Sequence, residues 1–149
     1  MTEADLIRFV NAQTPVYSRV IEELTDGCKR THWMWFIFPQ LAGLGLSAMA
    51  QRYAIRDLDQ ARRYLADAIL GKRLRQDVRR MMGNKGKSAL EILGSPDDCK
   101  FRSCLTLFGL AASEKSDLML FTEALDQFYL GEPDPGTLEL LRSMPPPQN

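Results

Sequence analysis

The chain has 149 residues, of which 45% are hydrophobic, and its 19 basic and 19 acidic side chains give a formal net charge of zero. This length is typical of one domain and supports a core that needs neither disulfides nor a structural metal. The neutral balance argues against a general nucleic-acid coat, and the apolar runs are too short to span a membrane, so we expect neither nucleic acid nor a membrane as a partner.

Helical signals follow one another along the chain. Residues of the N-cap type predict where helices begin, and they stand at Thr2, Thr14, Ser47, Asp57, Asp67, Ser88, Ser95, Ser116 or Asp117, and Asp134. No segment shows the alternating pattern of a half-buried strand. We therefore expect an all-α, compact multihelical domain over residues 1–143, with one or two buried central helices. Residues 144–149 are rich in proline and are expected to form a disordered tail.

The segment from His32 to Gln40 is the most apolar part of the chain. It is apolar on every side, so periodicity alone does not distinguish a helix from a strand. Its helical surroundings favour a short buried helix, with Thr31 as a possible cap and Pro39 as the stop. We expect this segment to lie at the centre of the core.

Trp33 and Trp35 belong to this segment, and each needs a partner for its indole N–H if it is buried. His32 is the one histidine of the chain. One interpretation is that all three residues are hydrogen-bonded parts of the core. The other is that His32 and one tryptophan line a pocket for a planar ligand, which would stack on the indole.

Two glycine-containing segments resemble phosphate-binding loops only in part. Gly43 and Gly45 precede a helix, but the third glycine and the preceding strand of a dinucleotide site are missing. Gly86-Lys-Ser88 resembles the end of a P-loop, but Met81 stands where that motif has its first glycine. Tight turns explain both segments, and we expect no cofactor.

The helix expected at 67–82 has one apolar face, formed by Ile69, Leu70, Leu74, Val78 and Met81. Lys72, Arg75 and Arg79 fall on the opposite, solvated face. Arg73 and Arg80 border the apolar face, one turn from Asp77. These charges form either an internal ion-pair cluster that orients the helix or a site where Arg73 turns its guanidinium toward an anion.

The helix expected at 96–112 is apolar almost all round from Cys104 onward, yet its early turns hold the polar residues Lys100, Arg102, Ser103 and Thr106. Buried polar groups need partners, which protein, water or a ligand can supply. We expect this helix to pack near residues 32–40. Its polar cluster is either a satisfied part of the core or the anion-binding part of a site.

Metal and nucleophile sites find little support. The three cysteines form no CxxC motif and there is one histidine, so we expect no metal. A Cys–His pair across the fold is possible, but no motif indicates it. The odd cysteine count and the acidic N-terminus, which lacks a hydrophobic leader, predict a cytoplasmic protein.

Several runs together resemble the bacterial family known as domain of unknown function 1810. They are Arg8-Phe-Val-x-Ala-Gln13, Thr31-His-Trp-Met-Trp-Phe-Ile-Phe-Pro-Gln40, Gly43-Leu-Gly-x-Ser47, Leu70-Gly-x-Arg-Leu74, Asp97-Asp-x-Lys-x-Arg-Ser103 and Thr106-Leu-Phe108. The resemblance spans residues 6–141 and implies a multihelical fold with buried central helices. It implies no established activity, cofactor or catalytic residue. Where the family often has His-Pro, this chain has Asp67-Ala68. Some members are labelled calpastatin, but such inhibitors are disordered and repetitive, and this chain is neither.

Two hypotheses of function remain open. In the first, the protein is a binding protein or an enzyme for a small, anionic, planar, nucleotide-like ligand. Its binding residues would be His32, Trp33, Trp35, Gln40, Arg73, Lys100, Arg102, Ser103 and Thr106, and no catalytic residue is assigned. In the second, the protein is a non-catalytic helical module that interacts with or regulates a partner. A monomer is favoured in both.

Overall fold

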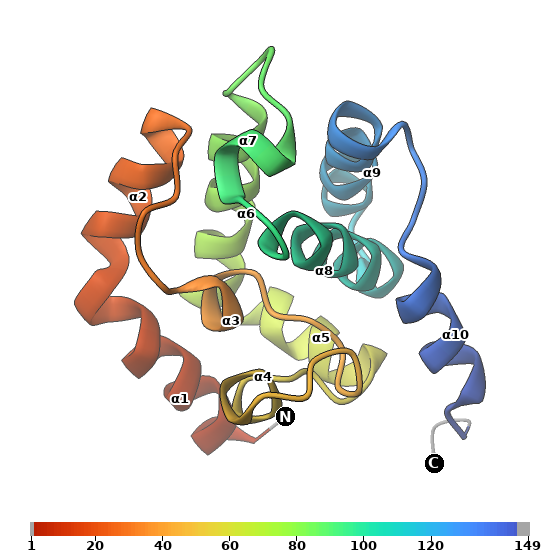
Figure 1. Ribbon diagram of the computed structural model, residues 1–149. Helices are drawn as coiled ribbons and strands as arrows, with labels where there is room; N and C mark the ends of the chain where they lie inside the picture. Colours follow the sequence, from red (N-terminus) through yellow and green to blue (C-terminus); the bar gives the residue numbers. More distant parts are fainter. Residues whose placement is uncertain (1, 146–149) are drawn as a thin grey trace.

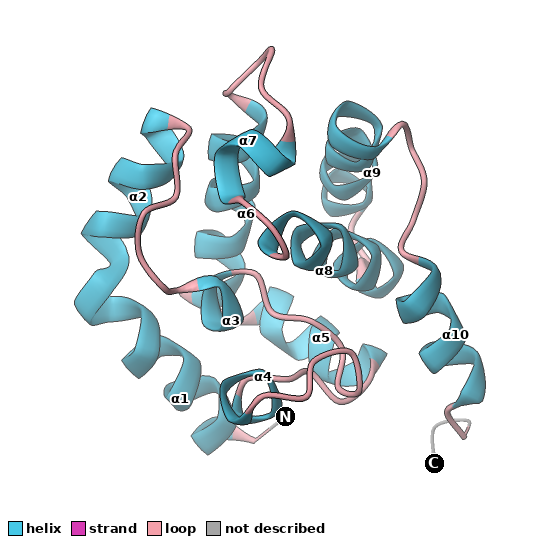
Figure 2. Cartoon of the chain, in the orientation of Figure 1, coloured by secondary structure: helices cyan, strands magenta, loops and turns pink. Residues whose placement is uncertain are grey.

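The computed structural model describes residues 2–145, which form ten α-helices and one 3-10 helix. These are α1 (Glu3–Gln13), the 3-10 helix η1 (Thr14–Val16), α2 (Tyr17–Asp26), α3 (Met34–Ile37), α4 (Ala48–Arg52), α5 (Leu58–Ala66), α6 (Leu70–Met82), α7 (Ala89–Leu93), α8 (Asp97–Ala111), α9 (Lys115–Tyr129) and α10 (Pro135–Ser143). Figure 2 shows helices joined by loops, with no strand in the described residues. Within these residues the β-type pairing is confined to an isolated bridge between Leu41 and Ile55. The predicted all-α fold is confirmed.

Helix α8 lies in the middle of the molecule, between the α1–α2 side and the α9–α10 side (Figure 1). It packs against α5, α7, α9 and α10. Every side chain from Ser103 to Phe108 is buried, as expected for the predicted central helix. Helix α6 forms a second support and packs against α1, α2, α5 and α9.

The expected short helix in the aromatic segment is present as α3. It begins at Met34 instead of near Thr31, and Trp33 occupies its N-cap position without a side-chain cap. The backbone N–H of Phe38 donates to the Met34 carbonyl at the end of the helix, one residue before Pro39. The side chains of Trp33, Met34 and Phe38 are buried, so this segment belongs to the core as expected.

Three side-chain caps illustrate why some helix starts were predictable, whereas α6, α8 and α9 have Ile69, Pro96 and Glu114 at their N-cap positions, without a side-chain cap. Thr2 and Ser88 each form a capping box, with Asp5 and Glu91 respectively. Asp134 accepts from the backbone N–H of Thr137 at the start of α10. Each cap satisfies backbone N–H groups that the helix itself leaves unpaired, which stabilises the fold by about 1 kcal/mol.

The N-cap predicted at Thr14 is wrong. Thr14 has right-handed helical dihedral angles and ends α1, and its hydroxyl donates to the Val10 carbonyl at 2.8 Å. The chain continues through η1, and α2 begins at Tyr17. Val20 and Leu24 of α2 are buried.

Ile69, which was predicted to face the core, is 46% exposed, and Leu118 of α9 is 48% exposed. Ile69 precedes α6, so it does not share the buried face of that helix. Helix α9 turns Leu120 and Phe121 inward, and Leu118 lies about 200° around the helix from Leu120. The spacing of apolar residues therefore predicts that α6 and α9 each have a buried face, but not which residues lie at its edges.

Arg75 is also placed differently from the prediction, which put it on a solvated face. Its Nε and Nη2 atoms donate to the two carboxylate oxygens of Asp117, at 2.6 and 2.9 Å, and Nη2 also donates to the Leu65 carbonyl at 3.0 Å. Asp117 is 5% exposed. This ion pair joins α6 to the first turn of α9, a long-range contact that the sequence of α6 does not reveal.

At the C-terminus, α10 ends at Ser143, and Met144 still packs against the core. Most of the predicted Pro-rich tail, residues 146–149, lies outside the described residues. Among residues 2–145, no helix combines the length and the apolar character that crossing a membrane requires.

Candidate functional site

Glu23 of α2 organises the chain that leads into α3. Its carboxylate accepts hydrogen bonds from the backbone N–H groups of Arg30 (2.7 Å) and Thr31 (2.9 Å), from the Thr31 hydroxyl (2.7 Å) and from the Trp33 indole N–H (3.1 Å). Glu23 is 2% exposed and Trp33 is 1% exposed. Trp33 is therefore a structural anchor, and its one polar group is fully used.

These hydrogen bonds keep Glu23 charged although it is buried. Burial alone would raise its pKa, because a low-dielectric surrounding disfavours the charged form. The donors from Arg30, Thr31 and Trp33 outweigh burial and lower the pKa of Glu23 to about 2. The negative charge thus persists across the physiological pH range and fixes the loop in place.

A row of alternating charges ties this loop to the start of α8. The Nζ atom of Lys29 lies 3.1 Å from an Asp97 carboxylate oxygen and 5.0 Å from the centroid of the Trp33 ring. Lys100 lies 3.6 Å from the other oxygen of Asp97 and 5.8 Å from the Trp35 ring. The prediction that this helix packs near residues 32–40 is therefore confirmed.

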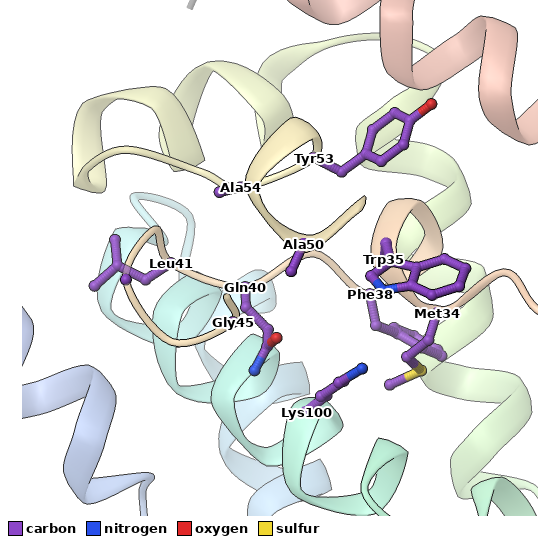
Figure 3. A pocket seen from close by; sticks show the side chains of 11 residues that line it. Met34, Trp35, Phe38, Gln40, Leu41, Gly45, Ala50, Tyr53, Ala54 and Lys100 are labelled. Carbon is purple, nitrogen blue, oxygen red and sulfur yellow. The ribbon is translucent and has the colours of Figure 1, made fainter. Parts of the chain in front are cut away.

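Trp35 borders a small pocket, named here the Trp35 pocket. It is lined by α3, the following loop, α4 and Lys100 of α8, through Met34, Trp35, Phe38, Gln40, Leu41, Gly43, Gly45, Ala50, Tyr53, Ala54 and Lys100. Figure 3 shows Lys100 pointing toward Met34 and Trp35, and Gln40 extending from the loop toward α8. The cavity volume is about 10 Å³, which is room for about one water molecule.

The polar groups of this pocket are largely unused. Within residues 2–145, the indole N–H of half-buried Trp35 and the side-chain amide of half-buried Gln40 make no hydrogen bond. Lys100 lies 3.6 Å from an Asp97 carboxylate oxygen and 5.8 Å from the centroid of the Trp35 ring. In residues 2–145 the buried side-chain polar atoms without a partner are Arg8 Nε and Asp98 Oδ1, so the polar atoms of Trp35 and Gln40 reach solvent and can bind water or a small polar group.

The remaining predicted site residues lie elsewhere or are fully engaged. His32 is exposed, and its ring makes no hydrogen bond or ion pair with the residues that the structure describes. Trp33 is buried behind the Glu23 contact. Of the nine predicted binding residues, the structure therefore brings Trp35, Gln40 and Lys100 together at one pocket.

Arg102, Ser103 and Thr106 hold the segment that leads into α10. Ser103 donates to Asp134 Oδ2 at 3.0 Å, and the backbone N–H of Asp134 donates to the Thr106 hydroxyl at 2.8 Å. Arg102 donates to the Glu132 carbonyl at 2.9 Å. Protein groups thus satisfy this half of the predicted polar cluster, and its contacts fix α10 on α8.

Arg73 belongs to a different network, between α6 and the α1–α2 junction. It donates to Gln13 Oε1 (3.2 Å) and to the Thr14 hydroxyl (3.3 Å), and its guanidinium lies 4.6 Å from the Tyr17 ring centroid. Gln13 is 1% exposed and donates to the Phe36 carbonyl at 2.7 Å. The network therefore contacts α3 through the Phe36 carbonyl, and none of its residues lines the Trp35 pocket.

Asp77, whose predicted neighbours were Arg73 and Arg80, is buried in the same region. It accepts from Arg80 at 2.7 Å and from the Tyr17 hydroxyl at 3.1 Å. Burial raises the pKa of Asp77 to about 6, although Tyr17 and Arg80 favour its charged form. The predicted internal ion-pair cluster exists, formed by Asp77 and Arg80.

Comparisons with known proteins identify the family. The family model described as "Protein of unknown function (DUF1810)" matches residues 3–141. The chain belongs to the DUF1810 family. The crystal structure of the conserved hypothetical protein Rv1873 from Mycobacterium tuberculosis is similar, with 46% sequence identity and a TM-score of 0.88. This match covers 94% of the present chain and 98% of that chain. No curated protein matches.

Three of the segments that carry the DUF1810 resemblance meet at the Trp35 pocket. They are residues 31–40, 43–47 and 97–103, and each contributes at least one lining residue. The rest of the lining is formed by Leu41, Ala50, Tyr53 and Ala54, which the sequence did not indicate because none of them belongs to a polar motif. Glu23 was missed too, although it shares the spacing of the buried residues Val20 and Leu24.

Cysteine and metal chemistry gain no support from this geometry. Cys104 is buried, and burial raises the pKa of its thiol. Burial and the neighbouring Asp98 carboxylate also raise the pKa of exposed Cys99. Raised values leave little of the reactive thiolate at neutral pH. No group of three or more His, Cys, Asp or Glu side chains in the described part of the chain is arranged to hold a metal.

Proposed function

We propose that this DUF1810 protein binds a small, planar, anionic ligand at the Trp35 pocket. The observation that supports this most is the convergence of the Trp35 indole and the Gln40 amide, which have no hydrogen-bond partner within residues 2–145, with the Lys100 ammonium, whose ion pair with Asp97 is loose at 3.6 Å. Polar groups on the buried side of the same segment are paired within the protein, as Glu23 and Trp33 are.

Each of the three groups suits one part of such a ligand. A half-exposed indole offers a flat apolar face for stacking. Lys100 supplies a positive charge 5.8 Å from the centroid of that ring, and an amide such as Gln40 can both donate and accept. A planar ring that carries a carboxylate or phosphate matches this combination.

The size of the cavity limits how the ligand binds. A space of about 10 Å³ does not hold a ring, because ligand pockets usually measure about 300–1,000 Å³. The ring therefore lies across the mouth of the pocket, against Trp35. The space between Gln40 and Lys100 admits only a small substituent of the ring, which would take the place of a water molecule. We assign no catalytic step to these residues.

Thermal-shift screening tests the proposal with nucleoside monophosphates, sugar phosphates and aromatic carboxylates as probes. A ligand at 100 times its dissociation constant adds about 2.7 kcal/mol to the stability of the fold. For a domain of this size, that raises the melting temperature by about 5–10 °C. We expect planar anions to give the largest shifts, above those of inorganic phosphate or a neutral nucleoside.

Matched variants locate the binding. Lys100→Met should lower the affinity for the best probe by about 10-fold, and Trp35→Phe should reduce the stacking contribution to that affinity. Lys72→Met removes the same charge from an exposed position on α6 and should leave binding unchanged. Equal affinity in the Lys100 and Lys72 variants would contradict the proposed site. No response to any probe would favour the alternative, a helical interaction module.

A further inference from the structure

A second cleft, separate from the Trp35 pocket, is lined mainly by charged and small side chains. It has a volume of about 310 Å³, within the usual range for small-molecule sites. Its lining comes from the end of α5, the turn into α6, and the connection from α8 to α9. The nine predicted binding residues do not contribute to it.

The Arg75–Asp117 ion pair forms a fixed part of this cleft. Both carboxylate oxygens of Asp117 accept from Arg75, and Arg75 also donates to the Leu65 carbonyl. Asp117 is almost completely buried. These charges are therefore already neutralised by each other, and they give the cleft a rigid polar wall.

Two further charged side chains in the lining have no ion-pair partner, although the Glu114 carboxylate, after Asp117, helps at longer range to raise the pKa of Arg75. Arg62 of α5 and Glu114 at the N-cap position of α9 are exposed, and neither forms an ion pair or side-chain hydrogen bond with the described residues. Asp67, the remaining carboxylate, has one oxygen engaged by the backbone N–H groups of Ile69 and Leu70. The cleft thus offers one unpaired cation and one unpaired anion, beside the apolar side chain of Leu65.

We propose that this cleft binds a zwitterion of the size of a free α-amino acid. Its carboxylate would pair with Arg62 and its ammonium with Glu114, and its side chain would lie against Leu65 and Ala68. The lining holds two arginines and three carboxylates, so a phosphate or another dianion would be repelled. Opposite charges on a single ligand satisfy both free groups at once, which neither a simple anion nor a simple cation does.

Isothermal titration of the full chain with L-leucine tests this proposal, with 4-methylpentanoate and 3-methylbutylamine as probes that lack the ammonium and the carboxylate respectively. We expect saturable binding of L-leucine and an affinity at least about 10-fold lower, about 1.4 kcal/mol, for each singly charged analogue. Equal binding of all three compounds, or no binding of L-leucine, would overturn the proposal.

Charge-neutral variants then assign the contacts. Arg62→Gln and Glu114→Gln should each lower the affinity for L-leucine by about 10-fold, whereas Arg62→Lys should keep part of that affinity. Arg79→Gln and Glu22→Gln change exposed residues on α6 and α2 and should have no effect. All four glutamine positions lie on the surface, so folding should be preserved. Undiminished binding in both the Arg62 and Glu114 variants would refute the assignment.

Lys100→Met should not change the affinity for L-leucine. A negative result at this cleft can therefore be told apart from a negative result at the Trp35 pocket.

Discussion

Trp33 and Trp35 are two residues apart, yet their surroundings differ in one decisive respect. On the Trp33 side, Glu23 uses its carboxylate to bind the indole N–H and three further donors. On the Trp35 side, the indole N–H and the Gln40 amide have no partner in residues 2–145. Two residues of the same type therefore differ here in whether their indole N–H has a partner inside the protein, and this difference is what the proposed site at Trp35 rests on.

Removing Glu23 tests the first half of this comparison and should have the largest effect. Glu23→Ala leaves four donors without their acceptor in a buried position, and unpaired buried groups cost about 1–3 kcal/mol each. Because water can reach some of them, we expect the free energy of unfolding to fall by about 3–5 kcal/mol. Urea denaturation followed by circular dichroism measures this, and a loss below about 1 kcal/mol would show that the cluster is not an anchor.

Asp134 links α10 to α8 and should come next. Its Oδ2 atom accepts from Ser103, from the Thr137 hydroxyl and from the Thr137 backbone N–H. Asp134→Ala removes a helix cap and an interhelical contact together, so we expect a loss of about 2–3 kcal/mol. Asp126→Ala, a change of an aspartate on α9, is the control in the same urea experiment and should lose less.

Asp77 should give the fold a pH dependence of a particular sign. Its pKa is raised from 3.8 to about 6 in the folded protein, so the folded state holds this proton more tightly than the unfolded state does. The contribution of Asp77 to stability therefore falls as the pH rises from about 4 to about 6. Asp77→Asn should remove this slope. Melting temperatures of both proteins across that window measure it, and parallel curves would contradict the buried-carboxylate explanation.

Lys100→Met should have the smallest effect on stability, within about 0.5 kcal/mol. The side chain is partly exposed, and its pairing with Asp97 is loose, at 3.6 Å. A binding residue of the Trp35 pocket should be dispensable for folding, in contrast to Glu23. Thermal unfolding without ligand checks this point, and a large destabilisation would show that Lys100 has a structural role.

Much of the fold was predictable because helix caps and apolar spacing are local signals. Asp134 predicted the start of α10 and Ser88 that of α7. The apolar run before Pro39 predicted the buried helix α3. Local signals failed where a distant partner decides the outcome. Arg75 is drawn inward by Asp117, forty-two residues later in the chain, and nothing in α6 indicates that partner.

The candidate site was predictable only in part for the same reason. Sequence placed Lys100, Ser103 and Thr106 in one polar cluster, since they share the early turns of a helix. The fold divides this cluster, because the chain after α9 returns to cover Ser103 and Thr106 and leaves Lys100 beside Trp35. The neighbours that decide this division are set by tertiary packing.

The bridge between Leu41 and Ile55 has a consequence for the dynamics of the pocket. Two backbone hydrogen bonds, from Ala42 to Ile55 and from Ile55 to Gln40, close the segment between them into a loop that carries α4. Helix α4 packs less extensively on its neighbours than α5 or α6 does. Such a segment can open as a unit at lower free energy than global unfolding. Amide hydrogen exchange should then be faster at residues 42–55 than along α8, and the wall of the Trp35 pocket would be a separate cooperative unit of the fold.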